Sequence, residues 1–265
     1  GMQGFTLYPG KAYIEIKVKI YNRTSFPQTF LWWANPAVVV NDHYHSVFPP
    51  DVNAVFDHGK RDVSSFPIAT GVYYKQDYSA GVDISKYKNI PVPTSYMAIK
   101  SKYDFVGGYE EEDGPYIELM TGMYTDNQPD FTWLQPYEEK SWVQYFMPYS
   151  EVGYVKNATK DALLNLEIKE GKARLVLYTT GANSGVRIIV KAIKGTVLLD
   201  KTTQISPSEP FITTFAAEGL KEEEVCAEVR DKEGQILLSY QADKPEIRPV
   251  PDPAKAAKDP QNIAS

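Results

Sequence analysis

Apolar and charged residues alternate along the first clear element of the chain, residues 13–20. The even positions from 14 to 20 are isoleucine or valine, and positions 15, 17 and 19 are charged. A period of two is that of a strand with one face in a core and the other in water. Residues 30–33, 37–40, 117–123 and 141–146 predict further strands, because they are rich in aromatic and aliphatic side chains.

Prolines and turn residues interrupt the remainder of residues 1–156, called here the first part of the chain. Asn35-Pro36 separates two of the predicted strands, and five further prolines lie between residues 41 and 110. Proline cannot donate to a strand ladder, so strands in this stretch are predicted to be short. No segment before residue 158 has a convincing helical period, so the first part is predicted to be all β.

The composition changes near residue 157. Only five aromatic residues follow residue 150, and short runs of alternating aliphatic residues occur at 174–178, 186–190 and 224–229. This spacing predicts a small β-sandwich of immunoglobulin-like architecture. From Lys244 the chain is rich in proline, alanine and lysine, which predicts an extended linker. The predicted domains are residues 1–156 and residues 157–243, followed by a linker at 244–265.

Bulk composition excludes some function classes. The chain has 265 residues, a net charge of −6 and a pI near 5.2, which argues against nucleic acid because phosphate binding needs a basic face. No apolar run reaches the length of about 18 residues that a membrane-spanning helix needs, so no membrane span is expected. The single Cys226 excludes an internal disulfide and a cysteine-rich metal site. No cofactor is predicted, and the location stays open between the cytoplasm and a bacterial periplasm.

A carboxylate within a predicted strand is the strongest chemical signal. Glu118 lies between Ile117 and Leu119, and neighbours in a strand point to opposite faces. On a concave aromatic face Glu118 would be partly desolvated, as suits a general base. The alternative is an ordinary strand on which Glu118 points into water.

Short polar side chains gather next to a tryptophan in residues 124–136. Asp126, Asn127 and Gln128 precede Trp133. Proteins hold sugars in this way, with aromatic faces against the ring C–H surfaces and carboxylates or amides on the hydroxyls. An ordinary polar loop has the same composition.

The three histidines, His43, His45 and His58, lie close together in the sequence. A His-x-His pair on a strand places both rings on one face, which is a possible metal arrangement, but no third ligand follows at a fixed spacing. Surface histidines explain the pair more simply, so no metal site is predicted. His58 lies among charged residues, either at the rim of a polar pocket or in a solvated loop.

The first part of the chain resembles family 5107 of domains of unknown function, a bacterial family commonly followed by tetratricopeptide repeats. The resemblance covers roughly residues 5–160 and rests on Asn22-Arg23-Thr24 and on residues 30–38, 48–51 and 114–135. It implies a galactose-mutarotase-like β-supersandwich, present here in part, ahead of the small sandwich. Tetratricopeptide repeats in the full-length protein would be a further partner.

A more distant likeness to sugar mutarotases implies a role for Glu118. The order of residues 117–119, 127–129, 134–138 and 142–146 is similar to the end of those enzymes, where a strand carries the catalytic base. Their acid is a histidine on an aromatic strand, and the corresponding residues 31–35 here contain none. Asn35 can donate a hydrogen bond there but cannot deliver a proton.

Three functions follow as expectations. The leading one is a carbohydrate-binding protein whose partner is a sugar or oligosaccharide. The second is a sugar epimerase or other carbohydrate-active enzyme with Glu118 as base and His58 as candidate acid. The third is a non-catalytic scaffold for a repeat array. The sequence leaves enzymatic activity open, and the residues expected to bind sugar are Trp32, Trp33, Asn35, Asp126, Asn127, Gln128 and Trp133.

Overall fold

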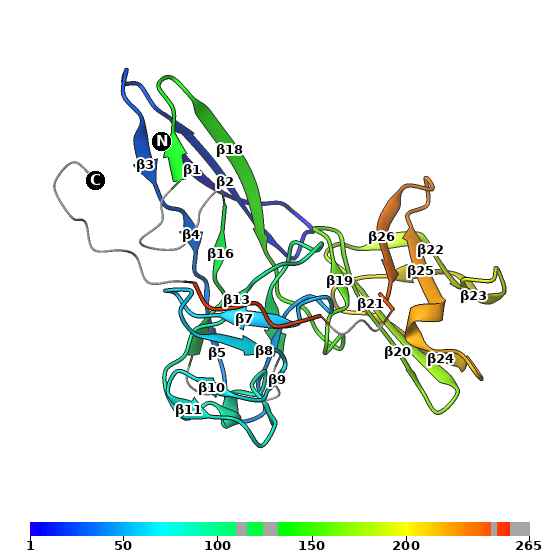
Figure 1. Cartoon of the computed structure of the whole chain (residues 1–265). Coiled ribbons are helices and arrows are strands. Elements are labelled where there is room, and N and C mark those ends of the chain that lie inside the picture. Colours follow the sequence, from blue (N-terminus) through cyan, green and yellow to red (C-terminus); the bar gives the residue numbers. More distant parts are fainter. Residues whose placement is uncertain (110–115, 124–131, 245–247, 255–265) are drawn as a thin grey trace.

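The chain is all β in a computed structural model that describes residues 1–109, 116–123, 132–244 and 248–254 (Figure 1). The predicted all-β class with sandwich-like sheets is confirmed. Within the described part the helices are two single 3₁₀ turns, η1 (Tyr87–Asn89) and η2 (Glu222–Glu224). Neither is long or apolar enough to cross a membrane.

The first sheet has three antiparallel strands in the order β1 (Met2–Leu7), β2 (Ile14–Tyr21) and β18 (Glu139–Phe146). Strand β2 confirms the strand predicted at residues 13–20, with Val18 buried and Lys17 and Lys19 exposed as expected, but Glu15, which was expected to face water, is only 7% exposed. Its register sets Val18 opposite Trp142, so both lie on the apolar face of the sheet. The edge strand β1 was not predicted from the sequence.

Four short strand pairs form one interrupted antiparallel ribbon, called here the ribbon. Each pair joins residues from 28–47 to residues from 107–134 (Figure 1). The pairs are β3 (Gln28–Phe30) with β17 (Thr132–Leu134), β4 (Trp33–Ala34) with β16 (Thr121–Gly122), β5 (Ala37–Val39) with β15 (Tyr116–Glu118), and β6 (His45–Val47) with β14 (Gly107–Tyr109). As predicted, Asn35-Pro36 interrupts one side, between β4 and β5.

The proline-rich middle of the chain forms very short strands around a core of its own. The strands are β7 (Ala54–Phe56), β8 (Val63–Ser65), β9 (Ile68–Ala69), β10 (Val72–Tyr73), β11 (Gln76–Asp77), β12 (Val82–Asp83) and β13 (Met97–Ala98). Buried Val55, Phe66 and Tyr73 pack together at its centre. The prediction that prolines keep these strands short is confirmed.

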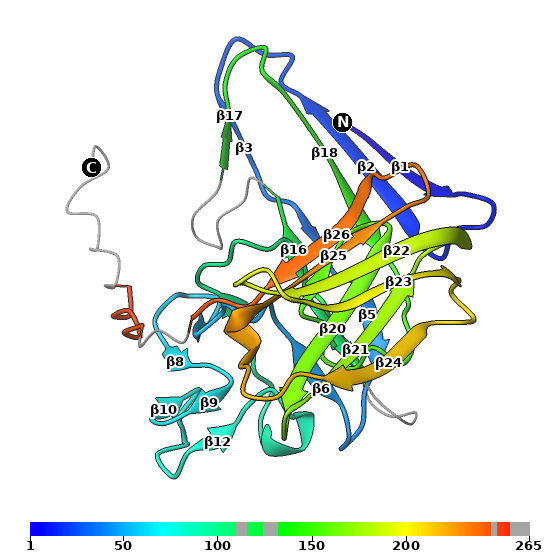
Figure 2. The ribbon, with the colours of Figure 1, turned by 90° about the vertical axis from the view of Figure 1, so that its right-hand side faces the viewer.

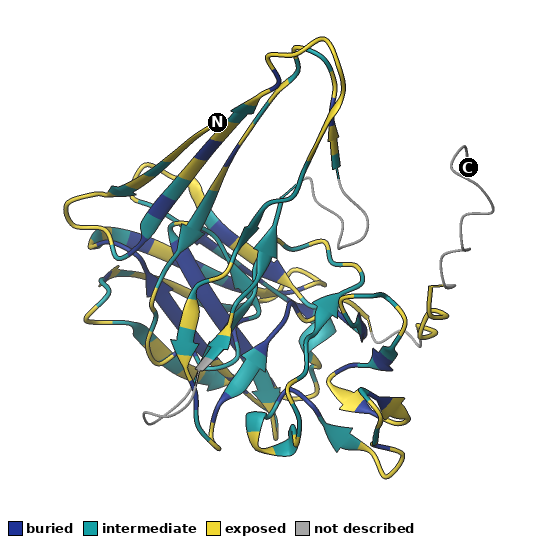
Figure 3. Ribbon diagram, turned by 90° about the vertical axis from the view of Figure 1, so that its left-hand side faces the viewer, coloured by how far each residue is buried: buried dark blue, intermediate teal, exposed yellow. Residues whose placement is uncertain are grey.

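Residues 157–241 form a sandwich of two four-stranded sheets, seen at the front of Figure 2. One sheet has the order β19-β20-β21-β24 and the other β23-β22-β25-β26. The strands are β19 (Asn157–Ala158), β20 (Ala162–Lys169), β21 (Lys172–Thr179), β22 (Asn183–Ala192), β23 (Val197–Ile205), β24 (Phe211–Ala216), β25 (Val225–Arg230) and β26 (Ile236–Gln241). Leu164, Leu175, Ile188 and Val229 are among the fully or almost fully buried residues between them. In Figure 3 the buried positions are concentrated in these strands.

The first part and the sandwich share a hydrophobic cluster, called here the seam. It contains Val47, Val152 and Val155 from the first part and Leu163, Val176 and Tyr178 from the sandwich. The chain before β2 adds a backbone hydrogen bond, because the amide of Ala12 donates to the carbonyl of Thr180 at 2.6 Å.

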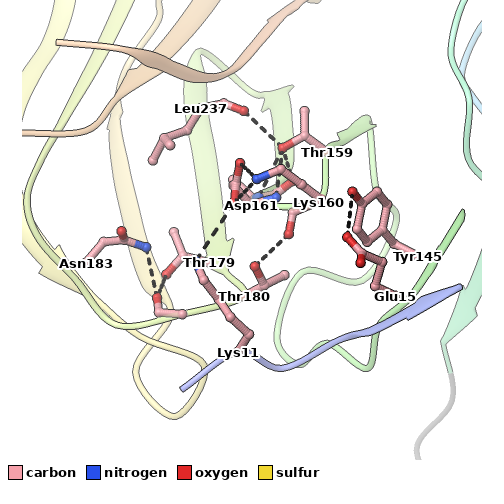
Figure 4. A network of polar contacts seen from close by, with 12 residues as sticks. Lys11, Glu15, Tyr145, Thr159, Lys160, Asp161, Thr179, Thr180, Asn183 and Leu237 are labelled. Atoms are coloured by element: carbon pink, nitrogen blue, oxygen red, sulfur yellow. Dashed lines mark hydrogen bonds and ion pairs between the residues drawn. The ribbon is translucent and has the colours of Figure 1, made fainter. Parts of the chain in front are cut away.

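Polar contacts border the seam where β2 begins (Figure 4). Lys11 Nζ lies 3.9 Å from the carboxylate of Asp161, and Lys160 Nζ lies 2.7 Å from it. Glu15 accepts hydrogen bonds from Lys17, Tyr8 and Tyr145, and the bond from Lys17 contributes most to holding the pKa of Glu15 below its usual value. Glu15 therefore stays ionised although it is only 7% exposed.

The C-terminal residues 248–254 lie against the first part. The side chain of Asn53 donates to the carbonyl of Arg248 at 3.3 Å, and the amide of Ala254 donates to the carbonyl of Lys60 at 2.6 Å. This segment therefore runs beside β7 and β13, as Figure 1 shows.

Residues 21–30 and 132–139, where the first sheet and the ribbon join at the top of Figure 1, are called here the arm. A buried asparagine holds the two segments of the arm together. Asn22 is 4% exposed, and its amide donates to the carbonyls of Phe26, Leu134 and Gln135. Its oxygen accepts from the amide and the hydroxyl of Thr24. Asn22 therefore acts as a structural clamp in the folded protein, although Asn22-Arg23-Thr24 matches the glycosylation sequon.

We expect Asn22→Ala to lower the free energy of unfolding by about 2 kcal/mol, because it removes the amide that donates to the carbonyls of Leu134 and Gln135. Urea unfolding measures the change. Gln28→Ala is the matched control, since this exposed amide makes a 3.3 Å bond to the Thr24 hydroxyl. Equal losses for the two variants would contradict the role given to Asn22.

Candidate functional site

Two exposed polar groups meet where the ribbon is interrupted. Asn35 lies between β4 and β5, and Glu118 ends β15 opposite Ala37. The amide nitrogen of Asn35 lies 3.4 Å from a carboxylate oxygen of Glu118. A hydrogen bond of this length is weak, so both groups retain the capacity to bind a ligand.

Trp33 lies on the same side of the ribbon. Positions two apart in an extended chain share a face, which groups 33, 35 and 37, and Trp33 is paired with Gly122 across the ribbon. A Cβ atom on Gly122 would lie 3.0–3.1 Å from three carbon atoms of the Trp33 ring. The ring therefore rests against the glycine, and a side chain at 122 would displace it.

Trp32 points to the opposite side, into the core. Its indole nitrogen donates to the side-chain oxygen of Gln144 at 2.8 Å, and its ring meets Trp142 edge-on at 5.5 Å. Gln144 in turn donates to the carbonyl and hydroxyl of Thr121, at 3.2 and 3.0 Å. Trp32 is thus a structural residue that fastens the ribbon to the first sheet, and Gln144 is a supporting residue that the sequence did not single out.

Trp133 continues the outer side of the ribbon towards the arm. It is paired with Thr29 and is 57% exposed. The neighbouring position, Phe30, stacks on Trp142 at 6.4 Å and so faces the core. By alternation Trp133 faces outward, as Trp33 does. The other predicted sugar ligands, Asp126, Asn127 and Gln128, lie outside the described residues.

The histidines lie elsewhere and contact other groups. His58 Nδ1 is 2.6 Å from the hydroxyl of Ser95. His45 stacks on Tyr109 with ring centres 5.0 Å apart, and burial lowers the pKa of His45, so its ring is neutral at physiological pH. His43 is exposed. Within the described ranges, no group of three potential ligands is arranged to hold a metal ion.

The outer side of the ribbon therefore carries one strip of four side chains, called here the strip: Trp133, Trp33, Asn35 and Glu118. It follows the ribbon from Thr29 to Ala37, which at about 3.3 Å per residue is roughly 26 Å. Glu118 is exposed, so the desolvation expected of a general base does not occur. Two indoles, an amide and a carboxylate suit the binding of an elongated polar ligand.

Comparison with known proteins contradicts the predicted family. A family model described as "YphG-like protein, second domain" matches residues 157–240, which form the sandwich. The predicted membership of family 5107 is therefore wrong, and the comparisons give no support to the mutarotase-like supersandwich that it implied. The motifs behind it have local structural roles here, since Asn22 clamps the arm and Asn35-Pro36 interrupts the ribbon.

Solved structures with some similarity include two bacterial proteins. The adhesin domain of Epf from Streptococcus pyogenes has 15% identity and a TM-score of 0.26, over 92% of this chain and 85% of that one. The β-glucuronidase of Ruminococcus gnavus has 9% identity and a TM-score of 0.23, over 87% of this chain and 35% of that one. Scores this low carry no argument about function.

Proposed function

We propose that the protein binds carbohydrate without transforming it. The observation that carries this proposal is the strip, in which Trp133 and Trp33 share one face of the ribbon with Asn35 and Glu118. Indole faces pack on the C–H surfaces of sugar rings, while amide and carboxylate groups bond to sugar hydroxyls. A strip of this length suits an oligosaccharide better than a single sugar. The negative charge of Glu118 favours neutral sugars over acidic ones.

The arrangement around Glu118 favours binding over epimerisation. An epimerase needs a proton donor opposite the base. The group bonded to Glu118 is the amide of Asn35, which cannot deliver a proton, and His58 is hydrogen-bonded to Ser95 instead. A base that is exposed to water also gains nothing from desolvation.

The proposal predicts that single changes on the strip weaken binding of neutral oligosaccharides. We expect Trp133→Ala and Asn35→Ala each to raise the Kd by about tenfold or more, because each removes a direct contact to the sugar. A glycan array selects the oligosaccharide, and titration calorimetry measures its Kd. Phe26→Ala is the control, since Phe26 is 71% exposed but lies in the turn between β2 and β3, off the ribbon. Wild-type affinity in both strip variants would contradict the proposal.

A further inference from the structure

A serine, a histidine and a tyrosine meet away from the strip, among the short strands of the middle of the chain. His58 belongs to the turn between β7 and β8, Tyr74 to the turn between β10 and β11, and Ser95 to the segment before β13. Three segments that are separate in sequence therefore converge on the Ser95 hydroxyl.

Both contacts to this hydroxyl are short. His58 Nδ1 lies 2.6 Å from Ser95 Oγ, and the hydroxyl of Tyr74 lies 2.6 Å from the same atom. When the ring of His58 carries its hydrogen on Nε2, Nδ1 accepts the serine proton and Tyr74 donates to Oγ. A serine hydroxyl within hydrogen-bond reach of a base is the arrangement from which nucleophilic serines react.

The partners of Ser95 are held in place by their own turns. Tyr74 and Lys75 both have positive φ, 50° and 61°, although neither is glycine. The Asp62 carboxylate accepts the amide of Tyr74 at 3.1 Å, which secures this costly turn. The hydroxyl of Tyr73 donates to the backbone carbonyl of Ser95 at 2.7 Å, which anchors the serine from below.

The cluster is reachable from solvent. His58 is exposed, and Ser95 and Tyr74 are half-buried. Tyr73 beneath them is fully buried and stacks on Tyr96 with ring centres 5.7 Å apart. Ser95 therefore lies next to an exposed histidine and over packed aromatic rings.

We propose that Ser95 is a nucleophile that His58 activates, and that its substrates are esters with a good leaving group. Ser95 Oγ attacks the acyl carbon while His58 takes the hydroxyl proton. The bond to the leaving oxygen breaks, and His58 returns the proton to that oxygen as the alcohol departs. Water, activated by the same histidine, then releases the acid and restores Ser95.

The test is covalent labelling of the full chain with a fluorophosphonate, followed by mass spectrometry of the peptide that contains residue 95. Labelling forms the Oγ–P bond and expels fluoride, and His58 takes the proton. We expect Ser95→Ala to abolish labelling at this peptide and His58→Gln to slow it by about 100-fold or more. Ser65→Ala is the control, because the Ser65 hydroxyl donates to the backbone carbonyl of Ile68 at 2.7 Å and not to a histidine.

A second variant separates chemistry from misfolding. In a Cys226→Ser background, Ser95→Cys places a thiol beside His58, and its alkylation by iodoacetamide should slow by at least tenfold when His58→Gln is added. Unlabelled wild-type protein, or equal labelling with and without His58, would overturn the proposal. Because these variants leave the strip intact, oligosaccharide binding should be unchanged, so failure here is distinct from failure of the proposed function.

Discussion

Trp142→Ala should lower the free energy of unfolding by about 3–5 kcal/mol, which is the usual cost of removing a buried large aromatic side chain. Trp142 is 6% exposed and lies opposite Val18 at the centre of the first sheet. Phe30 stacks on it and Trp32 meets it edge-on. Alanine would leave a cavity next to Phe30 and Trp32. The packing between the first sheet and the ribbon would therefore weaken.

Urea unfolding measures the change, and Val143→Ala is the matched control on the same strand. Val143 faces the other way and is 41% exposed, so its truncation should cost no more than about 0.5 kcal/mol. A loss for Trp142→Ala as small as that for Val143→Ala would show that the ribbon does not depend on this contact.

Gly108→Ala should lower the free energy of unfolding by about 3 kcal/mol, because the new methyl group would overpack the core. The added Cβ would overlap the phenol ring and hydroxyl of Tyr44. Tyr44 is 2% exposed, and its amide and carbonyl are bonded to Asn41 and Tyr87. Because the ring is buried, it cannot swing aside without displacing the residues packed around it.

Two comparisons make this prediction sharp. Gly107→Ala is the neighbouring control, because a Cβ at 107 meets nothing within 4 Å. Adding Gly108→Ala to Tyr44→Ala should cost much less than adding it to the wild type, since the obstructing ring is gone. Thermal or urea unfolding of the four variants measures both effects. An equal cost in the two backgrounds would rule out the overlap with Tyr44 as the cause.

Local pattern was enough to predict the strands that carry a strong period of two. The alternation at residues 13–20 became β2, and the predicted strands at 174–178 and 186–190 lie within β21 and β22. The predicted strand at 224–229 starts one residue before β25 and otherwise lies within it. In each, a buried face packs against a neighbouring sheet, so burial leaves a direct trace in the sequence. Edge strand β1 leaves a weaker trace, because Phe5 and Leu7 are 66% and 73% exposed.

The pairing of strands that are far apart in the sequence, on which the strip depends, could not be predicted from the local pattern. Glu118 was expected on a strand, and it ends β15, but nothing in the sequence sets it beside Asn35, because register depends on the partner strand. The structure also does not bring Trp32 and Trp33 to one surface. Adjacent positions on an extended chain face opposite ways, and Trp32 faces the core, where Gln144 holds it.

The seam also constrains how this sandwich can be reused. Leu163, Val176 and Tyr178 are buried because Val47, Val152 and Val155 cover them. A relative that joins the same sandwich to a different neighbour must supply other apolar side chains there, or replace these three with polar ones. Residues on the two sides of the seam should therefore covary among relatives. The residue types at positions 163, 176 and 178 would then indicate which kind of domain packs against the sandwich in each relative.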